Sequence, residues 1–301
     1  MSGNKAQGGK SGLVLTPGGW RPKSQVHVLE PGHHISGKEG KTRIVRTATG
    51  EVIKDFGKTS KKNRFAGSAP GVKSSGTKPA FPDNAWIENS QWTNNSSNSG
   101  KPIVYFKTKW VVPRAPRTKN GQVIFLFNGL QQTPSGPYIL QPVLQWGVSA
   151  AGGGNYWSVT NWYVNGQGGS AVFGALAKVN PGDKLLGIMT LMSQSGNLFS
   201  YGSSFIGFPA ASDLVVQDID ELAWACETLE CYGLTKCSDY PHARRTSFYD
   251  IQIKIGKSVS LGKNAHLNWQ PVTNFTDCGQ KCVIVSNKSP GGKVDLYYRH
   301  H

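Results

Sequence analysis

From residue 81 onward the sequence consists of short apolar or alternating runs, each followed by a cluster of turn residues. Runs such as "GQVIFLFNGLQ", "YILQPVLQWG" and "SFYDIQIKIG" have the length of strands, and "TKNG", "NPGD" and "SPGG" supply turns. Glycine (37 residues) and proline (17 residues) are frequent, and aromatic residues make up 10% of the chain. Many short strands separated by turns predict an all-β domain, residues 81–301, in which two antiparallel sheets pack as a sandwich.

Residues 1–80 differ from this domain in charge. They carry 15 Lys and Arg against 4 Asp and Glu, a net charge of +11 within the total of +16. Residues 12–57 contain strand-like pieces that suit a small β-meander, and residues 58–80 have the composition of a linker. A solubilising tail is one interpretation of this basic extension, and docking on the domain's own acidic "DLVVQDIDELAW" segment or cleft, as a propeptide-like element, is another. The composition favours nucleic-acid binding least.

The N-terminus has no apolar signal-peptide core, and no run is long enough to span a membrane, so the chain as written predicts a cytoplasmic protein, or a secreted one if the N-terminus is incomplete. The five cysteines match no common zinc spacing, and we expect neither a metal nor a cofactor. Their spacing allows short-range disulfides Cys231–Cys237 and Cys278–Cys282 with Cys226 free in an oxidising compartment, or five thiols in a cytosol.

Two apolar runs each hold one polar residue that a buried strand does not need. In "YILQPVLQWG" the strand period of two places Gln141 and Gln145 on one face and Trp146 on the other. In "ELAWACETLE" the same period places Glu227 on the face opposite Trp224. We interpret the polar faces as turned toward a groove lined by aromatic side chains, which would suit an extended polymer.

These motifs, in their order along the chain, resemble those of the eqolisins, the fungal glutamic peptidases, which fold as a jelly-roll β-sandwich. The resemblance runs from about Trp92 to Tyr298. It implies that Gln141 and Glu227 are the catalytic pair, and that Cys231 and Cys237 close a small disulfide loop. The other positions that it implies line the substrate groove are Trp92, Asn128, Gln145, Trp146, Asn161 and Tyr163.

The sequence departs from the family pattern beside the expected pair. Amides stand where the family carries acids, at Asn128, Gln145 and Asn161, and Ile124 replaces a tryptophan. Neighbouring carboxylates raise one another's pKa, so their loss predicts a pH optimum less acidic than is usual for the family.

One carboxylate and one amide form a minimal hydrolytic pair. The carboxylate takes a proton from water and returns it to the leaving nitrogen, while the amide holds the water and donates to the oxyanion. The leading hypothesis is therefore an endopeptidase-like hydrolase that uses Gln141 and Glu227 on a polypeptide. The alternative is an inactive or repurposed sandwich that binds a glycan or peptide in the same groove. Either residue has a plainer interpretation, Gln141 as a backbone partner at a strand irregularity and Glu227 as a solvent-facing acid.

Overall fold

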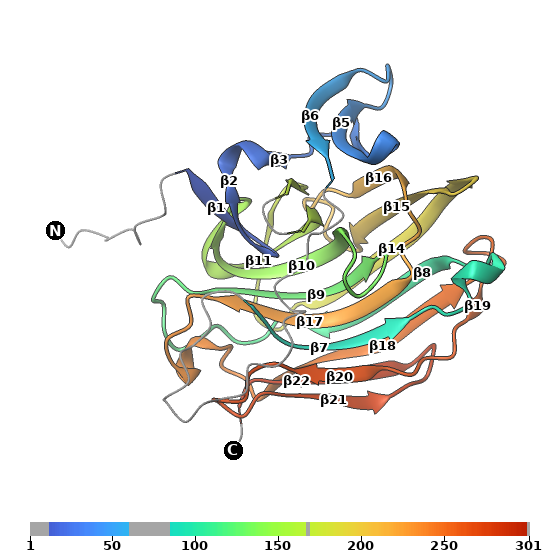
Figure 1. The fold of residues 1–301 in the computed structure, drawn as a ribbon. Coiled ribbons are helices and arrows are strands. Elements are labelled where there is room, and N and C mark those ends of the chain that lie inside the picture. The colour runs from blue at the N-terminus through green and yellow to red at the C-terminus, as the bar shows by residue number, and fades with distance from the viewer. Residues whose placement is uncertain (1–11, 60–84, 167–168, 300–301) are drawn as a thin grey trace.

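The computed structural model describes residues 12–59, 85–166 and 169–299 (Figure 1). This part of the chain is a β-sandwich without an α-helix. The nine-stranded sheet has, in spatial order, β20 (Gln270–Thr273), β7 (Ala85–Thr93), β17 (Trp224–Tyr232), β9 (Val123–Gln131), β10 (Tyr138–Ser149), β11 (Gly152–Asn165), β12 (Ala171–Phe173) and β3 (Val26–Val28), with β13 (Ala177–Val179) pairing with β11.

The eleven-stranded sheet packs against it. Its strands, in spatial order, are β21 (Lys281–Ser286), β22 (Gly292–Tyr297), β18 (Arg245–Ile255), β8 (Ile103–Val111), β14 (Lys184–Ser195), β15 (Leu198–Phe205), β16 (Leu214–Ile219), β4 (His33–Ser36), β5 (Lys41–Arg46) and β6 (Val52–Lys58), with β19 (Lys263–Asn264) pairing with β18. Four single-turn 3-10 helices connect strands: η1 (Lys23–Gln25), η2 (Lys38–Gly40), η4 (Ser97–Ser99) and η5 (Cys237–Asp239). The all-β, two-sheet sandwich predicted from the sequence is confirmed.

Two hydrophobic clusters define the faces of the nine-stranded sheet. The larger cluster holds residues of both sheets, such as Phe106 of β8 and Leu140 of β10, and fills the space between them. The smaller cluster holds Phe127 of β9, Trp162 of β11 and Leu15 of the N-terminal segment. We call the face that packs on the other sheet the inner face, and the opposite face, with the smaller cluster, the outer face.

The N-terminal segment is built into this sandwich. A hairpin of β1 (Leu13–Thr16) and β2 (Gly19–Pro22) lies beside β10 and β11 (Figure 1), and the Ala150 N–H donates to the Leu15 carbonyl oxygen at 2.7 Å. β3 pairs in parallel with β12, and β4 pairs in parallel with β16, inside the acidic "DLVVQDIDELAW" segment. β4, β5 and β6 form an antiparallel meander. The expected linker lies outside the described residues from residue 60 on.

This segment is joined to the rest of the described chain by backbone pairing, and also by Arg21, which donates to the Gly166 and Gly169 carbonyl oxygens. Its direct ion pairs within the described ranges are internal, with Arg43 contacting Glu39 and Asp55, and Arg46 contacting Glu51. Pairing of the chain's own strands at the ends of both sheets covers edges that would otherwise expose unpaired N–H and C=O groups.

The disulfide expectation is wrong in its pairing. The structure joins Cys237 to Cys278 across 41 residues, with a Cα–Cα distance of 5.5 Å, and leaves Cys231 and Cys282 as buried thiols. Cys231 lies on β17, and its side chain packs in the core between the sheets. It is therefore not paired with Cys237, which lies in the turn after this strand. Cys237 opens the η5 turn, and Cys278 lies in the turn before β21, so two surface turns meet where the spacing suggested local loops.

Candidate active site on the outer face

The carboxyl group of Glu227 lies between the two sheets. Its side chain is fully buried on the inner face, and its Oε1 accepts a hydrogen bond of 2.6 Å from the Thr108 hydroxyl of β8, in the opposite sheet. Burial raises its pKa well above the ordinary value, against the opposing effect of the Thr108 hydrogen bond. The rise favours the protonated form of Glu227, whose hydrogen bond with Thr108 joins the two sheets.

Gln141 occupies the outer face of the same sheet. It pairs with Trp162 of β11, a member of the smaller hydrophobic cluster, and its neighbours Ile139 and Val143 belong to that cluster as well. Its side chain is 1% exposed, and neither amide atom has a hydrogen-bond partner among the described residues. A buried amide without a hydrogen-bond partner costs stability.

The expectation that Gln141 and Glu227 face one another around a common water is wrong. The strand period assigned each residue to the correct face of its own strand, but those faces point to opposite sides of the sheet. β10 places Gln141 with the smaller hydrophobic cluster, while β17 places Glu227 against Thr108 of the other sheet. Strand β9 separates the two residues, and the sheet itself lies between their side chains.

The expected groove residues separate in the same way. The aromatic members, Trp92, Trp146 and Tyr163, belong to the inter-sheet core instead of lining an open groove. Asn128 and Asn161 also point inward. The Asn128 amide donates to the Gly187 carbonyl oxygen of β14 at 3.5 Å.

Asn161 links β11 to β15 of the opposite sheet and to the loop before β16 through the two ends of its amide. Its Nδ2 donates to the Ser212 carbonyl oxygen at 3.0 Å, and its Oδ1 accepts from the Ser203 hydroxyl at 2.7 Å. Gln145, alone with Gln141 among the expected residues, lies on the outer face. Its amide is satisfied locally, by the Gly147 and Gly152 carbonyl oxygens and the Ser149 hydroxyl.

A buried polar cluster on the outer face contains a carboxyl group that the sequence analysis did not select. Glu230 of β17 is fully buried, and its Oε1 accepts hydrogen bonds from the Tyr232 hydroxyl and, at 2.7 Å, from the Gly18 backbone N–H of the N-terminal hairpin. Arg21 of the same hairpin is also buried. We call Glu230, Tyr232, Gly18 and Arg21 the outer-face cluster.

The guanidinium of Arg21 fixes the hairpin in place. Its Nη1 donates to the carbonyl oxygens of Gly166 and Gly169, at 3.0 and 2.7 Å, and its Nε donates to the Thr16 hydroxyl at 2.7 Å. Burial lowers its pKa to about 10, so it remains positively charged at neutral pH, and the nearby Tyr232 and Glu230 act in the opposite direction. The hairpin therefore brings a buried cation close to a buried acid.

The outer-face cluster tunes Glu230 to neutral pH. Burial raises the pKa of its carboxyl to about 7, and the hydrogen bonds from Tyr232 and Gly18 and the charge of Arg21 restrain that rise. Burial also raises the pKa of Tyr232 well above its ordinary value, so the phenol stays protonated. A carboxyl that titrates near 7 beside a phenol O–H is a pairing that acid–base chemistry uses.

The strand register gives the distance between this carboxyl and Gln141. Glu230 is opposite Phe125 of β9, and Phe125 is opposite Gln145 of β10. Gln141 lies four residues further along β10, about 13 Å along the strand direction, and two strands, or about 10 Å, across the sheet, so the two residues are about 16 Å apart. The residue of β17 opposite Gly129, nearest to Gln141 along the sheet, is Cys226, a buried thiol whose pKa burial raises.

A second acid in the same run was the available signal for Glu230. "CETLE" places Glu227 and Glu230 three positions apart, and an odd spacing on a strand turns the two carboxyls to opposite faces. Whichever face is functional, one of the two acids reaches it. The partners Gly18 and Arg21 come from the far end of the chain and have no signal in the sequence.

No group of three or more His, Cys, Asp or Glu side chains within the described ranges is arranged to hold a metal ion. None of the helices found there has the length and apolar character needed to cross a bilayer.

No protein-family model and no curated protein matches this sequence. Among solved structures, scytalidoglutamic peptidase bound to a peptide-based transition-state analogue is similar, with 12% identity and a TM-score of 0.43, over 71% of this chain and 99% of that one. The same enzyme with a transition-state analogue inhibitor gives a TM-score of 0.40, over 71% and 98%. SCP-B, an eqolisin in complex with the tripeptide Ala-Ile-His, gives 12% identity and 0.39, over 71% and 99%. The likeness is distant and concerns the fold.

Proposed function

We propose that the protein is a latent hydrolase of polypeptides in which Glu230 acts first as general base and then as general acid. The outer-face cluster carries the proposal. It places a carboxyl of pKa about 7 beside a protonated phenol, and the carboxyl accepts a hydrogen bond from a segment of polypeptide backbone. The pair expected from the sequence, Gln141 and Glu227, does not share a face and is not proposed again as a unit.

Each group of the cluster has a place in amide hydrolysis. The ionised Glu230 takes a proton from water as the water oxygen bonds to the carbonyl carbon, and returns it to the nitrogen as the C–N bond breaks. The Tyr232 O–H, released from Glu230, donates to the oxyanion that forms on the carbonyl oxygen.

The N-terminal hairpin explains the latency. The Gly18 N–H occupies Glu230 Oε1 in the way that a backbone N–H of a substrate would, and Arg21 holds the hairpin through two hydrogen bonds, to the Gly166 and Gly169 carbonyl oxygens. Water reaches the carboxyl after the hairpin moves away. Gln141, whose amide has no partner among the described residues, would then bind substrate backbone about 16 Å from Glu230, a span of about five extended residues.

The test uses the full chain with Arg21→Ala, which loosens the hairpin without deleting it, on a protein substrate between about pH 3 and 8. We expect hydrolysis to rise relative to wild type. Adding Glu230→Gln should lower the rate by about 10²–10⁴, the usual contribution of an acid–base group. The matched control, Arg21→Ala with Glu227→Gln, carries the same chemical change three residues away on the inner face and should keep its activity.

Two results would reject the assignment. Activity that is lost with Glu227→Gln and kept with Glu230→Gln would place the chemistry on the inner carboxyl. An absence of turnover in every variant would reject hydrolysis by this face altogether.

A second candidate is a binding module that holds an extended peptide without cleaving it. The observation in its favour is that the N-terminal segment attaches by backbone pairing, with β3 parallel to β12 and the Leu15 carbonyl bonded to Ala150. This is how proteins that bind peptides by strand addition hold their ligands. A peptide that binds the Arg21→Ala protein, remains intact, and is released by substitution of Gln141 would establish it.

A further inference from the structure

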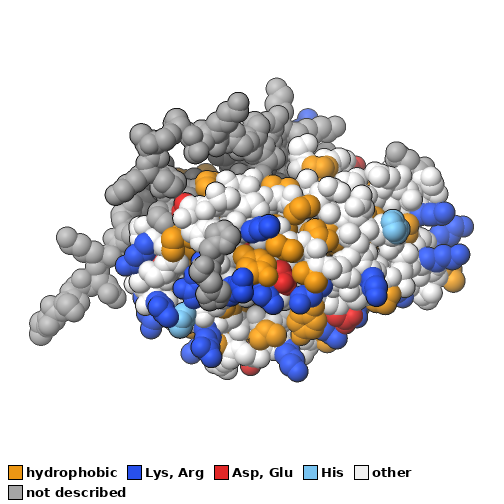
Figure 2. All heavy atoms as spheres, turned by 90° about the horizontal axis from the view of Figure 1, so that it is seen from below, with side chains coloured by type: hydrophobic (Ala, Val, Ile, Leu, Met, Phe, Trp, Pro, Cys, Tyr) orange, Lys and Arg blue, Asp and Glu red, His pale blue; other side chains and the backbone are white. Residues whose placement is uncertain are grey.

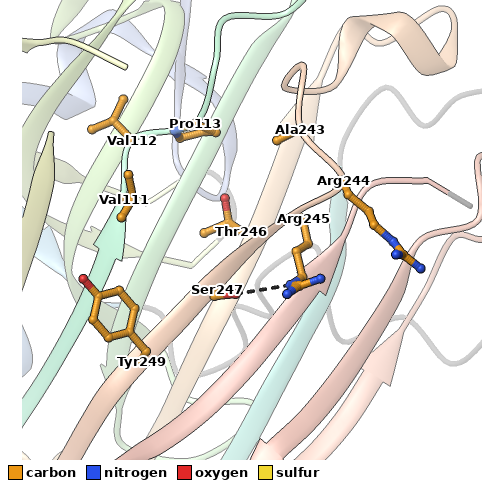
Figure 3. Close-up of a pocket in the computed structure, with 9 residues that line it drawn as sticks. All are labelled: Val111, Val112, Pro113, Ala243, Arg244, Arg245, Thr246, Ser247 and Tyr249. Atoms are coloured by element: carbon orange, nitrogen blue, oxygen red, sulfur yellow. Dashed lines mark hydrogen bonds between the residues drawn. The ribbon is translucent and has the colours of Figure 1, made fainter. Parts of the chain in front are cut away.

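A pocket opens in the eleven-stranded sheet where β8 and β18 separate. Their register begins at Tyr249 opposite Lys109, although β18 starts four residues earlier at Arg245 and β8 continues to Val111. The cavity measures about 390 Å³. The residues that line it are Val111, Val112, Pro113, Ala243, Arg244, Arg245, Thr246, Ser247 and Tyr249 (Figure 3).

The walls of this pocket differ in character. Val111, Val112 and the ring of Tyr249 lie on one side, and Arg244 and Arg245 lie on the other (Figure 3). Val111 is 40% exposed, an unusual position for a valine on a strand that otherwise buries its apolar side chains. The pocket thus offers a flat aromatic and aliphatic surface opposite two guanidinium groups.

The two arginines lie over the same ring, that of Tyr297, Arg244 at 5.4 Å and Arg245 at 5.3 Å, but they differ in their other partners. Arg245 Nε lies 2.9 Å from Asp295 Oδ2 and 3.3 Å from the Ser247 hydroxyl, which fixes its orientation. Arg244 is exposed, and its guanidinium lies over the Tyr297 ring at 5.4 Å, with no acidic partner among the described residues. Arg244 is therefore positioned by an aromatic ring and retains an unneutralised charge.

More positive charge surrounds the pocket. Burial lowers the pKa of the His242 imidazole. The nearby positive charges of Arg114, Arg117 and Arg299 lower it further. On the view from below β20, β21 and β22, Lys and Arg side chains outnumber acidic ones (Figure 2). Within the described residues these three arginines form no ion pair, so this end of the sandwich attracts polyanions.

We propose that this pocket and the basic surface around it bind single-stranded nucleic acid. One base lies against Tyr249 and Val111 inside the pocket, and the phosphates on either side contact Arg244 and the cluster of Arg114, Arg117 and Arg299. Aromatic surfaces interleaved with cations are the usual means by which proteins bind unpaired strands. The cavity volume suits one nucleotide unit, and a flat anionic membrane would have no use for it.

The test measures binding of a fluorescently labelled 12-nucleotide oligouridylate to the full chain by anisotropy at several salt concentrations. Tyr249→Ala should weaken binding by roughly fivefold to a hundredfold, the range for losing one stacked base, while Tyr249→Phe should bind like wild type. Arg244→Gln should reduce the slope of log affinity against log salt by about 0.7. The matched control is Lys178→Gln, which removes the same charge from an exposed position on β13 of the other sheet.

The proposal fails if Tyr249→Ala binds the oligouridylate as tightly as wild type, since the contact would then be charge attraction by other basic residues. It also fails if Lys178→Gln and Arg244→Gln change the salt slope equally. A sulfated polysaccharide or anionic vesicles that bind more tightly than the oligonucleotide, with a dependence on Arg244 and none on Tyr249, would assign the surface to that other class. Thermal melting of each variant checks that it is folded.

Discussion

Glu230→Gln should remove a distinct part of the pH dependence of stability. Burial raises the pKa of the Glu230 carboxyl from 4.5 to about 7 in the folded protein. Below pH 4.5 both states hold the proton. As the pH rises toward 7, the unfolded chain releases it while the folded protein retains it, so the free energy of unfolding falls. Above about pH 7 both states are ionised and the fall stops.

The magnitude follows from the two pKa values. A difference between 4.5 and about 7, at about 1.4 kcal/mol per pH unit, amounts to about 3 kcal/mol. Glutamine carries no charge at any pH, so the variant lacks this fall. Urea denaturation of wild type and Glu230→Gln, repeated between about pH 4 and 8, should show their difference in free energy of unfolding change by about 3 kcal/mol in favour of the variant.

A control separates this effect from the titration of other groups. Burial also raises the pKa of two other carboxyls, Glu227 and Glu88, the latter to about 9, but both are present in the two proteins and cancel in the difference. Glu30→Gln makes the same chemical change at an exposed position and serves as the matched control. Parallel curves for wild type and Glu230→Gln would show that Glu230 is not held in the environment described.

Three further predictions concern the frame that positions this face. Cys237→Ser should destabilise the protein by about 4 kcal/mol, the chain-entropy value for a 41-residue loop, whereas Cys231→Ser should leave the disulfide intact. A disulfide-linked peptide containing Cys231, found by mass spectrometry, would contradict this pairing. Thr108→Val should cost about 1–3 kcal/mol in denaturant unfolding because Glu227 loses its partner, and Thr108→Ser should restore most of it; equal losses would rule out the hydrogen bond as the cause. Gly147→Ala should be far more destabilising than Gly182→Ala. Both glycines have positive φ, but a Cβ at position 147 would lie 2.4 Å from the Gln122 carbonyl oxygen, whereas a Cβ at position 182 would meet no atom within 4 Å. Similar melting temperatures of the two variants would refute the close approach at Gly147.

The sequence pattern predicted the sandwich and the sidedness of individual strands. Short runs and turn clusters located the strands, and the period of two placed Gln141 with Val143, and Asn161 on the face opposite Trp162. What the pattern could not give was which of the two faces points toward the other sheet. Strands β9 and β17 are buried along both faces, so their hydrophobic residues do not distinguish inside from outside.

That ambiguity decided the candidate site. An alternating strand such as β8 shows its buried side in the sequence, but β17 does not, and Glu227 was assigned to a groove when it lies in the core. The carboxyl on the outer face, Glu230, gains its environment from Gly18 and Arg21, more than 200 residues away in the chain. The same holds for the Cys237–Cys278 disulfide, because short spacing in sequence carries no information on which surface turns meet.

The protonation of the two carboxyls can be observed directly by infrared spectroscopy of the C=O stretch, comparing wild type with Glu230→Gln and Glu227→Gln between about pH 5 and 9. We predict that the protonated-carboxyl band removed by Glu230→Gln disappears in wild type as the pH passes about 7, while the band removed by Glu227→Gln persists through neutral pH. If the band that titrates near neutrality is instead the one lost in Glu227→Gln, the outer face is not the site of acid–base chemistry.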